Sequence, residues 1–255
     1  MQHDVSRGRD RDHRPGVEGS RWNLVIESVP VNVKGRRINL AGRRRAFYSG
    51  AVLWRLPARF LTTGLDLSSG NKWTQTSSTS ASGDEARQFF AAKFPAGYIE
   101  GSPASDGYLR FLVEELKPLI DARYRSLPDQ PNTCIMGSSM GGLVSLYAIA
   151  QYPEVFGGAG CLSTHWIAGE NMLVDYLGER LPPPANHRLY FDFGTITLDE
   201  AYEPFQVRMD GWLSKAGYAL GQNWTTLKFE GAAHTEAAWR ARVDLPLRFL
   251  LSQQA

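Results

Sequence analysis

A serine with a glycine two residues before it and another two residues after it stands where an apolar run gives way to a helical pattern. The segment "GSSMG", Gly137–Gly141, has Ser139 at its centre. A G-x-S-x-G sequence between a strand and a helix is typical of a nucleophile elbow, a sharp and strained turn that exposes the serine hydroxyl. We therefore predict that Ser139 is a nucleophile, and the alternative is a plain glycine-rich turn in a core.

The helix expected after Ser139 brings a second chemical function. Free N–H groups and the positive end of the helix dipole face the position of the serine oxygen. An oxyanion hole uses such donors to stabilise the negative oxygen that develops during acyl transfer. We predict that the backbone N–H of Met140 is its first donor.

A base for the serine must come from one of five histidines, because a hydroxyl is a poor nucleophile without one. His234, in "FEGAAHTEAAW", follows the last expected strand and fits the chain order serine, acid, histidine. We predict that His234 is the general base. His165, in "CLSTHW", follows the strand after the elbow and is expected near the site. His187 begins a strand and is expected at the surface.

The acid that orients the histidine should follow a strand between Ser139 and His234. The segment "YFDFGTITLDEAYEP" offers three carboxylates. Asp199 and Glu200 come after the expected strand end, and Asp192 lies inside the strand. We choose Asp199, whose other interpretation is an N-cap for the helix that begins near residue 201. Asp192 stays an alternative, either as the acid or as a buried residue bound to backbone.

Strand and helix patterns alternate from residue 106 onwards, and the candidate residues fall at their junctions. The expected helices are 106–124, 141–152, 201–218 and 236–253, and the expected strands are 132–137, 155–163, 187–194 and 223–234. We expect prolines to kink the first helix at residue 118 and to interrupt the last near residue 246. The alternation predicts an α/β fold, a mostly parallel sheet with helices on both faces.

The N-terminal third is atypical. Residues 1–20 are charged and have almost nothing to bury, so we expect a disordered arm there, whereas residues 21–33 alternate as a strand would. Between residues 40 and 105 the clearest strand candidate is 50–56, and 84–94 fits a short helix. We assign residues 21–255 to a single domain.

Composition and charge narrow the function classes. The chain is 43% hydrophobic and carries a net charge of +2, with 13 Lys and Arg against 5 Asp and Glu in residues 1–60. No nucleic-acid motif accompanies the basic run at 35–45, which we interpret as solvated, so no nucleic-acid partner is expected. No apolar run is long enough for a membrane and no apolar leader is seen, which predicts no membrane partner and a cytoplasmic location. Cys134 and Cys161 are expected to be buried free thiols.

These segments together resemble a known family. Residues 106–252 are similar to the putative-esterase branch of the α/β-hydrolases, which includes siderophore, feruloyl and acetyl-xylan esterases, S-formylglutathione hydrolase and the mycolyltransferases. The likeness rests on "YLRFLVEELKPLIDARYR", "GSSMGGLVSLYAIAQYPEVFGGAGCLS", "YFDFGT" and "GAAHTEAAWRARV". It implies an α/β-hydrolase-like fold, a triad of Ser139, His234 and Asp199, and neither a metal nor an organic cofactor.

The N-terminal third departs from that family. Its members carry a buried strand that ends in a His-Asp-Gly or similar tract, which gives the second oxyanion N–H. Here "TTGLDLSSGNKW", residues 62–73, occupies about that place but is polar, and no histidine lies between His13 and His165. We hypothesise that residues 36–90 are diverged, rebuilt or read in a shifted frame, and sequencing the source DNA tests the last version.

Two functions follow from these observations. The first is a serine carboxylic-ester hydrolase that acts through an acyl-enzyme on a small-molecule or glycan-linked ester. The second is a catalytically silent relative with an incomplete oxyanion site, which serves as a binding scaffold or is a damaged copy. The intact elbow and the position of His234 favour the first function, and the missing tract favours the second.

Overall fold

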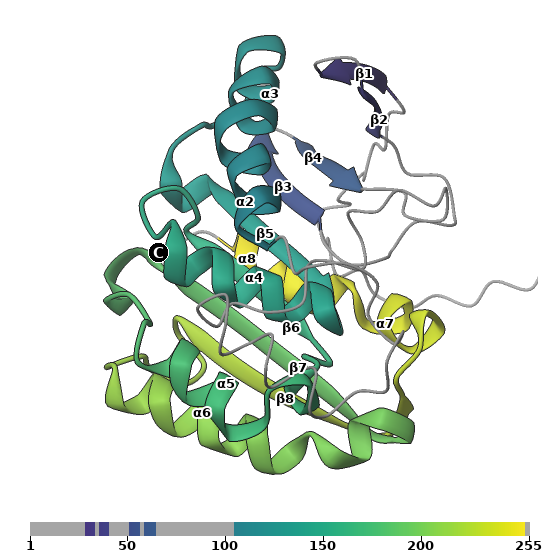
Figure 1. The fold of residues 1–255 in the computed structure, drawn as a ribbon, viewed down its shortest axis with the longest axis vertical. Coiled ribbons are helices and arrows are strands. Elements are labelled where there is room, and N and C mark those ends of the chain that lie inside the picture. Colours follow the sequence, from purple (N-terminus) through teal and green to yellow (C-terminus); the bar gives the residue numbers. More distant parts are fainter. Residues whose placement is uncertain (1–28, 34–35, 41–50, 57–58, 65–104, 253–255) are drawn as a thin grey trace, which may run out of the picture.

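The computed structural model describes residues 29–33, 36–40, 51–56, 59–64 and 105–252, and Figure 1 shows how their strands and helices are arranged. The arm expected over residues 1–20, the helix expected over 84–94 and much of segment 36–90 lie outside the described residues. The single domain over 21–255 and the reading-frame hypothesis therefore stay predictions.

Among the described residues, six strands form the main sheet, in the spatial order β4-β3-β5-β6-β7-β8. Four of them are parallel and follow the expected strands closely: β5 (Thr133–Ser138), β6 (Gly158–Leu162), β7 (Arg188–Ile196) and β8 (Trp224–Ala233). The predicted parallel sheet is thus confirmed for these strands. Because parallel strands end at the same edge, the loops that follow β5 to β8 gather there.

The N-terminal strands are antiparallel instead. Two of them extend the main sheet beyond β5 and two form a separate hairpin: β3 (Ala51–Leu56) with β4 (Arg59–Gly64), and β1 (Val29–Val33) with β2 (Arg36–Leu40). The strands of each pair are close neighbours in the chain, whereas a parallel pair needs a crossover of about a dozen residues or more. β3 coincides with the strand candidate at 50–56, and β1 covers the end of the expected strand at 21–33, but β2 and β4 were not predicted.

Helices cover both faces of the sheet, as the alternating pattern predicted. One face carries α4 (Met140–Gln151), α5 (Glu170–Gly178) and α6 (Glu203–Lys215), whose buried residues share one core cluster. On the other face, α8 (Asp244–Leu251) contacts β6 and β7, and Figure 1 shows it in yellow behind the sheet. A short helix, α7 (Glu236–Arg242), precedes α8 and begins close to the end of β8.

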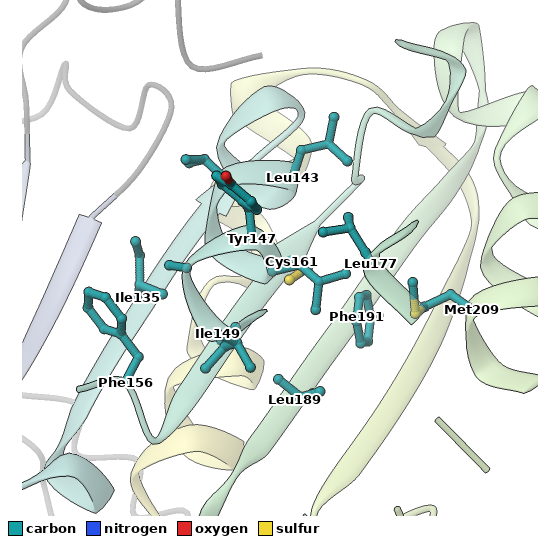
Figure 2. Packing of buried hydrophobic residues seen from close by; sticks show 14 of the residues in the cluster. Ile135, Leu143, Tyr147, Ile149, Phe156, Cys161, Leu177, Leu189, Phe191 and Met209 are labelled. Atoms are coloured by element: carbon teal, nitrogen blue, oxygen red, sulfur yellow. The ribbon is translucent and has the colours of Figure 1, made fainter. Parts of the chain in front are cut away.

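The alternation of side chains along the strands divides the core in two. In β5, Ile135 belongs to the larger cluster, with residues of α4, whereas Cys134 and Met136 belong to the smaller one, with Leu250 of α8. Figure 2 shows the larger cluster around Cys161. Both cysteines are buried free thiols, as predicted.

The first expected helix has three parts rather than one kink. α2 (Ser105–Arg110) runs into a π-helical turn (Phe111–Leu116), and α3 (Lys117–Arg123) follows it. At the end of the wider turn the Lys117 N–H donates to the carbonyl of Leu112, five residues back. Pro118 lies at the start of α3, directly after the π-helical turn.

The last expected helix is interrupted close to Pro246, as predicted. The break is at Val243, between α7 and α8, and Pro246 lies within the first turn of α8 rather than at the interruption. Pro246 can lie there because the first N–H groups of a helix have no acceptor within it, so a proline in the first turn is tolerated.

Two further features differ from the sequence expectations. Helix α5 was not predicted, because it is short and shows only a brief apolar spacing, with Leu173, Val174 and Leu177 buried. His187 is buried and not at the surface. Its Nδ1 lies 3.0 Å from the Pro183 carbonyl oxygen, and its Nε2 lies 3.1 Å from the Gln130 side-chain nitrogen, so the ring can donate through one nitrogen and accept through the other.

The core makes a prediction about stability. Leu189 of β7 is fully buried, whereas Leu220 is 64% exposed. Leu189→Ala should lower the free energy of unfolding by about 2–5 kcal/mol, because it removes packed methyl groups and leaves a cavity. Leu220→Ala is the matched control and should change it by about 0.5 kcal/mol or less. Urea denaturation of both variants makes the comparison, and equal losses would contradict this core.

Candidate active site

Ser139 is the single residue between the end of a strand and the start of a helix. β5 ends at Ser138 and α4 begins at Met140, and the backbone of Ser139 has a φ of 57°. This is the left-handed region, which non-glycine residues enter rarely and at a cost in energy. The turn is tight, because a Cβ added to Gly137 would lie 2.6 Å from the carbonyl carbon of Gly141. The glycine at that position is therefore required by close backbone approach.

His234 lies beside Ser139 although 95 residues separate them. It follows β8, and its Nε2 atom is 2.8 Å from the Ser139 Oγ. Its backbone N–H donates to the Thr197 Oγ1 at 2.9 Å, which fixes the chain at the strand end. The rings of Trp239 and His234 pack in a T-shaped arrangement, with 4.9 Å between ring centroids. The side chain of His234 is only 9% exposed.

Asp199 lies on the other side of the imidazole. It belongs to a 3₁₀ turn, Thr197–Ala201, which follows β7, and it is buried. Its Oδ1 is 2.5 Å from the His234 Nδ1. Its Oδ2 accepts the Gly194 N–H and the Ser163 hydroxyl, each at 2.6 Å. The carboxylate thus has partners on both oxygens.

The hydrogen bonds decide the charge of Asp199. Burial alone raises its pKa, but donation from His234, Ser163 and Gly194 outweighs burial, and the pKa is lowered. Only glycine fits at position 194, because a Cβ there would lie 2.0 Å from the Ala232 carbonyl oxygen and 3.0 Å from the Asp199 Oδ2 that accepts the Gly194 N–H. Asp199 is therefore a carboxylate at neutral pH.

The other two candidate acids lie elsewhere. Glu200 is exposed, directly beyond Asp199. Asp192 is buried in β7, where it accepts hydrogen bonds from Arg242 and Tyr190 at 2.9 and 3.0 Å. Burial raises the pKa of Asp192, while Arg242 opposes the shift. Among these three residues, the structure places only Asp199 in hydrogen-bond contact with His234.

His165 lies near the other residues, as the sequence suggested. Its backbone N–H donates to the Ser139 carbonyl at 3.2 Å, and its Nδ1 is 2.7 Å from the Tyr202 hydroxyl. The rings of His165 and His234 are 6.1 Å apart. Burial, with a smaller contribution from His234, lowers the pKa of His165 to about 4, so this imidazole is neutral at neutral pH.

Met140, whose N–H is the predicted first oxyanion donor, lies at the start of a helix. Met140 is the first residue of α4, so its N–H has no acceptor within the helix. The second donor was expected from the N-terminal third, and the segment at 62–73 lies largely outside the described residues. In the described ranges no group of three or more His, Cys, Asp or Glu residues could hold a metal ion. No helix in those ranges is long and apolar enough to cross a membrane.

Comparison with known proteins places this arrangement in context. The family model described as "Putative esterase" matches residues 78–244, which is more than half of the chain. An uncharacterized protein of Bacillus subtilis (strain 168), YbbA, is 29% identical over 115 residues. The match covers 44% of this chain, and this chain spans less than half of that relative's length.

Solved structures show similarity of fold. An IroE-like serine hydrolase from Shewanella oneidensis has a TM-score of 0.56 and 13% identity, over 76% of this chain and 60% of that one. An enterochelin esterase from Shigella flexneri has a TM-score of 0.44 and 22% identity, over 63% and 39%. A ferulic acid esterase has a TM-score of 0.45 and 18% identity, over 56% and 60%. The TM-score with the IroE-like hydrolase shows that this chain has an α/β-hydrolase fold, and at 13% identity the likeness extends to the fold alone.

Proposed function

This chain belongs to the putative esterase family, and on that premise we propose that it is a serine carboxylic-ester hydrolase with a triad of Ser139, His234 and Asp199. The observation that carries the proposal is a continuous line of hydrogen-bond distances. It runs from the Ser139 Oγ to the His234 Nε2 at 2.8 Å and from the His234 Nδ1 to the Asp199 Oδ1 at 2.5 Å.

The proposed reaction begins with proton transfer from Ser139 to His234. As the Nε2 atom takes the hydroxyl proton, Oγ bonds to the ester carbonyl carbon, and the Met140 N–H donates to the oxygen that becomes negative. The carbon–oxygen bond to the alcohol then breaks, and His234 returns the proton to the leaving alcohol. Water repeats these steps on the acyl-enzyme, releasing the acid and restoring Ser139.

The electrostatics of the site support this assignment. When His234 takes the serine proton it becomes an imidazolium, which the charged carboxylate of Asp199 stabilises. The neighbouring His165 stays neutral at neutral pH because burial lowers its pKa to about 4. Two histidine rings therefore lie 6.1 Å apart without a second positive charge opposing the first.

The substrate class we propose is a small-molecule or glycan-linked ester. Proteins named as a ferulic acid esterase and an enterochelin esterase are among the similar structures, and their names describe esters of this kind. Acyl transfer to another alcohol would use the same residues, because only the second nucleophile differs.

One observation favours a second candidate, the catalytically silent relative. The His-Asp-Gly tract that would give the second oxyanion donor is missing from the sequence. Removal of a single oxyanion donor typically lowers a rate by about 10²–10³. Turnover measurements on the intact chain separate the two candidates.

The direct test is hydrolysis of p-nitrophenyl acetate and butyrate. Ser139→Ala should abolish measurable turnover, because the variant has no nucleophile. Ser138→Ala is the matched control: it removes the neighbouring hydroxyl of the same segment and should keep turnover within about threefold. Failure of the folded wild-type chain to hydrolyse either ester, together with no labelling by a fluorophosphonate probe, would favour the silent relative.

A second test decides which acid acts. Asp199→Asn should lower kcat by about 10³–10⁴, because an amide neither holds the required tautomer of His234 nor stabilises its charged form. Glu200→Gln, one residue along and exposed, should leave kcat nearly unchanged. Steady-state kinetics at pH 8 with p-nitrophenyl butyrate compare the two, and a larger loss in Glu200→Gln would overturn the assignment.

A further inference from the structure

A buried group of polar side chains lies next to Asp199 and is connected to its Oδ2 atom. Its members are Ser163, which directly follows β6, Asp192 of β7, and Trp239 and Arg242 of α7. All four residues are at least nine-tenths buried. The reaction proposed above uses none of them, although the Ser163 hydroxyl contacts the Asp199 carboxylate.

The direction of each hydrogen bond at Ser163 follows from the chemistry of its partners. The Trp239 Nε1 lies 2.9 Å from the Ser163 Oγ, and the Arg242 Nη2 lies 3.1 Å from it. Indole and guanidinium N–H groups donate and do not accept, so they occupy the acceptor sites of the hydroxyl oxygen. The single proton of Ser163 is then directed to its remaining partner, the Asp199 Oδ2 at 2.6 Å.

The guanidinium of Arg242 is itself fixed in place. Its Nη2 also donates to the Asp192 Oδ1 at 2.9 Å, and the Tyr190 hydroxyl donates to the Asp192 Oδ2 at 3.0 Å. The Ser163 N–H donates to the Asp192 carbonyl at 2.7 Å. The buried Arg242–Asp192 ion pair thus fixes the N–H group that donates to the Ser163 hydroxyl, while the main chain of Asp192 holds the Ser163 backbone.

The backbone of Ser163 is strained. A residue that only filled space in the core would not require such a conformation. Its φ is 42°, in the left-handed region that glycine adopts with least cost. Strained residues of this kind concentrate at functional sites, where the surroundings hold them in place. A serine at this position supplies a hydroxyl that glycine lacks.

The geometry points to Ser163 as a positioning residue of the proposed triad. It relays N–H donation from α7 to the Asp199 Oδ2, which keeps that carboxylate charged and leaves its Oδ1 for the His234 Nδ1. This inference rests on the proposed function, because it assigns Asp199 the role of the acid. Ser163 does not contact the reacting atoms.

Loss of the Ser163 hydroxyl should have a signature in pH. Hydrogen bonds to a carboxylate favour its charged form, so their removal raises the pKa of Asp199 from its lowered value. The other titratable groups that face Asp199 and His234 are His165, with a pKa of about 4, and Tyr202, and the charged Arg242–Asp192 pair contacts Ser163. Because Asp199 is active as the carboxylate, the activity of such a variant should fall increasingly as the pH is lowered.

The test compares Ser163→Gly and Ser163→Ala with the wild-type chain. The glycine variant suits the left-handed backbone and stays informative where alanine at a positive φ impairs folding. We expect kcat/KM for p-nitrophenyl butyrate to fall about 10–100-fold at pH 8, the equivalent of one hydrogen bond to a charged group. The deficit should widen further between pH 7 and pH 5, moving the acid limb of the profile to higher pH.

Ser145→Ala is the matched control. Ser145 is also fully buried, but its hydroxyl donates to the Gly141 carbonyl within α4 at 2.7 Å and is not connected to Asp199. This variant should show a pH profile of wild-type shape. Circular dichroism and urea denaturation verify that each variant is folded at every pH used.

A second measurement does not depend on activity. The proton on the His234 Nδ1, hydrogen-bonded to a carboxylate, should give a downfield NMR signal in the wild-type chain. In Ser163→Gly this signal should disappear at a higher pH than in the wild type, since Asp199 gains its proton sooner.

The outcomes separate the two proposals. An unchanged kcat/KM, or a loss of the same factor at every pH with an unshifted NMR signal, would overturn the role of Ser163 and leave the triad standing. A wild-type chain without turnover or fluorophosphonate labelling would overturn the proposed function. The NMR comparison would then still decide whether Ser163 keeps Asp199 charged.

Discussion

A buried carboxylate is the group on which the geometry of the candidate site depends. Transfer of an isolated charge into a protein interior is costly unless hydrogen bonds or an opposite charge compensate for it. Asp199 has three partners, the imidazole of His234, the hydroxyl of Ser163 and the N–H of Gly194, and together they lower its pKa despite burial. Each partner comes from the end of a different strand, so the charge links β6, β7 and β8 at one edge of the sheet.

The same edge concentrates strained backbone. Ser139, Ser163 and Thr197 directly follow β5, β6 and β7, and each has a positive φ. Their side chains contact His234, Asp199 and the His234 backbone, respectively. The parallel sheet provides the rigid support for this strain, because its strands are hydrogen-bonded to neighbours and packed on both faces. Strained backbone thus coincides with the candidate site at three successive strand ends.

The sequence could predict some residues of the candidate site and some elements of the fold better than others. The G-x-S-x-G segment and the four parallel strands have local patterns. The chain order of serine, acid and histidine then indicated His234, and it left Asp199, Glu200 and Asp192 as candidates for the acid. No local pattern marks Ser163, because its role depends on Asp199 and on α7, distant in the chain. The sequence also failed to predict the burial of His187, which depends on tertiary contacts. It failed to predict β2 and β4, which depend on pairing with β1 and β3 rather than on their own periodicity.

The most direct test of the account is to find which atom reacts with a fluorophosphonate. The intact chain would be treated with the probe, and the mass of the protein and of its peptides would be measured. We predict one adduct per chain, on Ser139, formed more slowly in Asp199→Asn and absent in Ser139→Ala. An adduct on Ser138 or another residue, or none on folded protein, would contradict the claim that Asp199 and His234 activate Ser139.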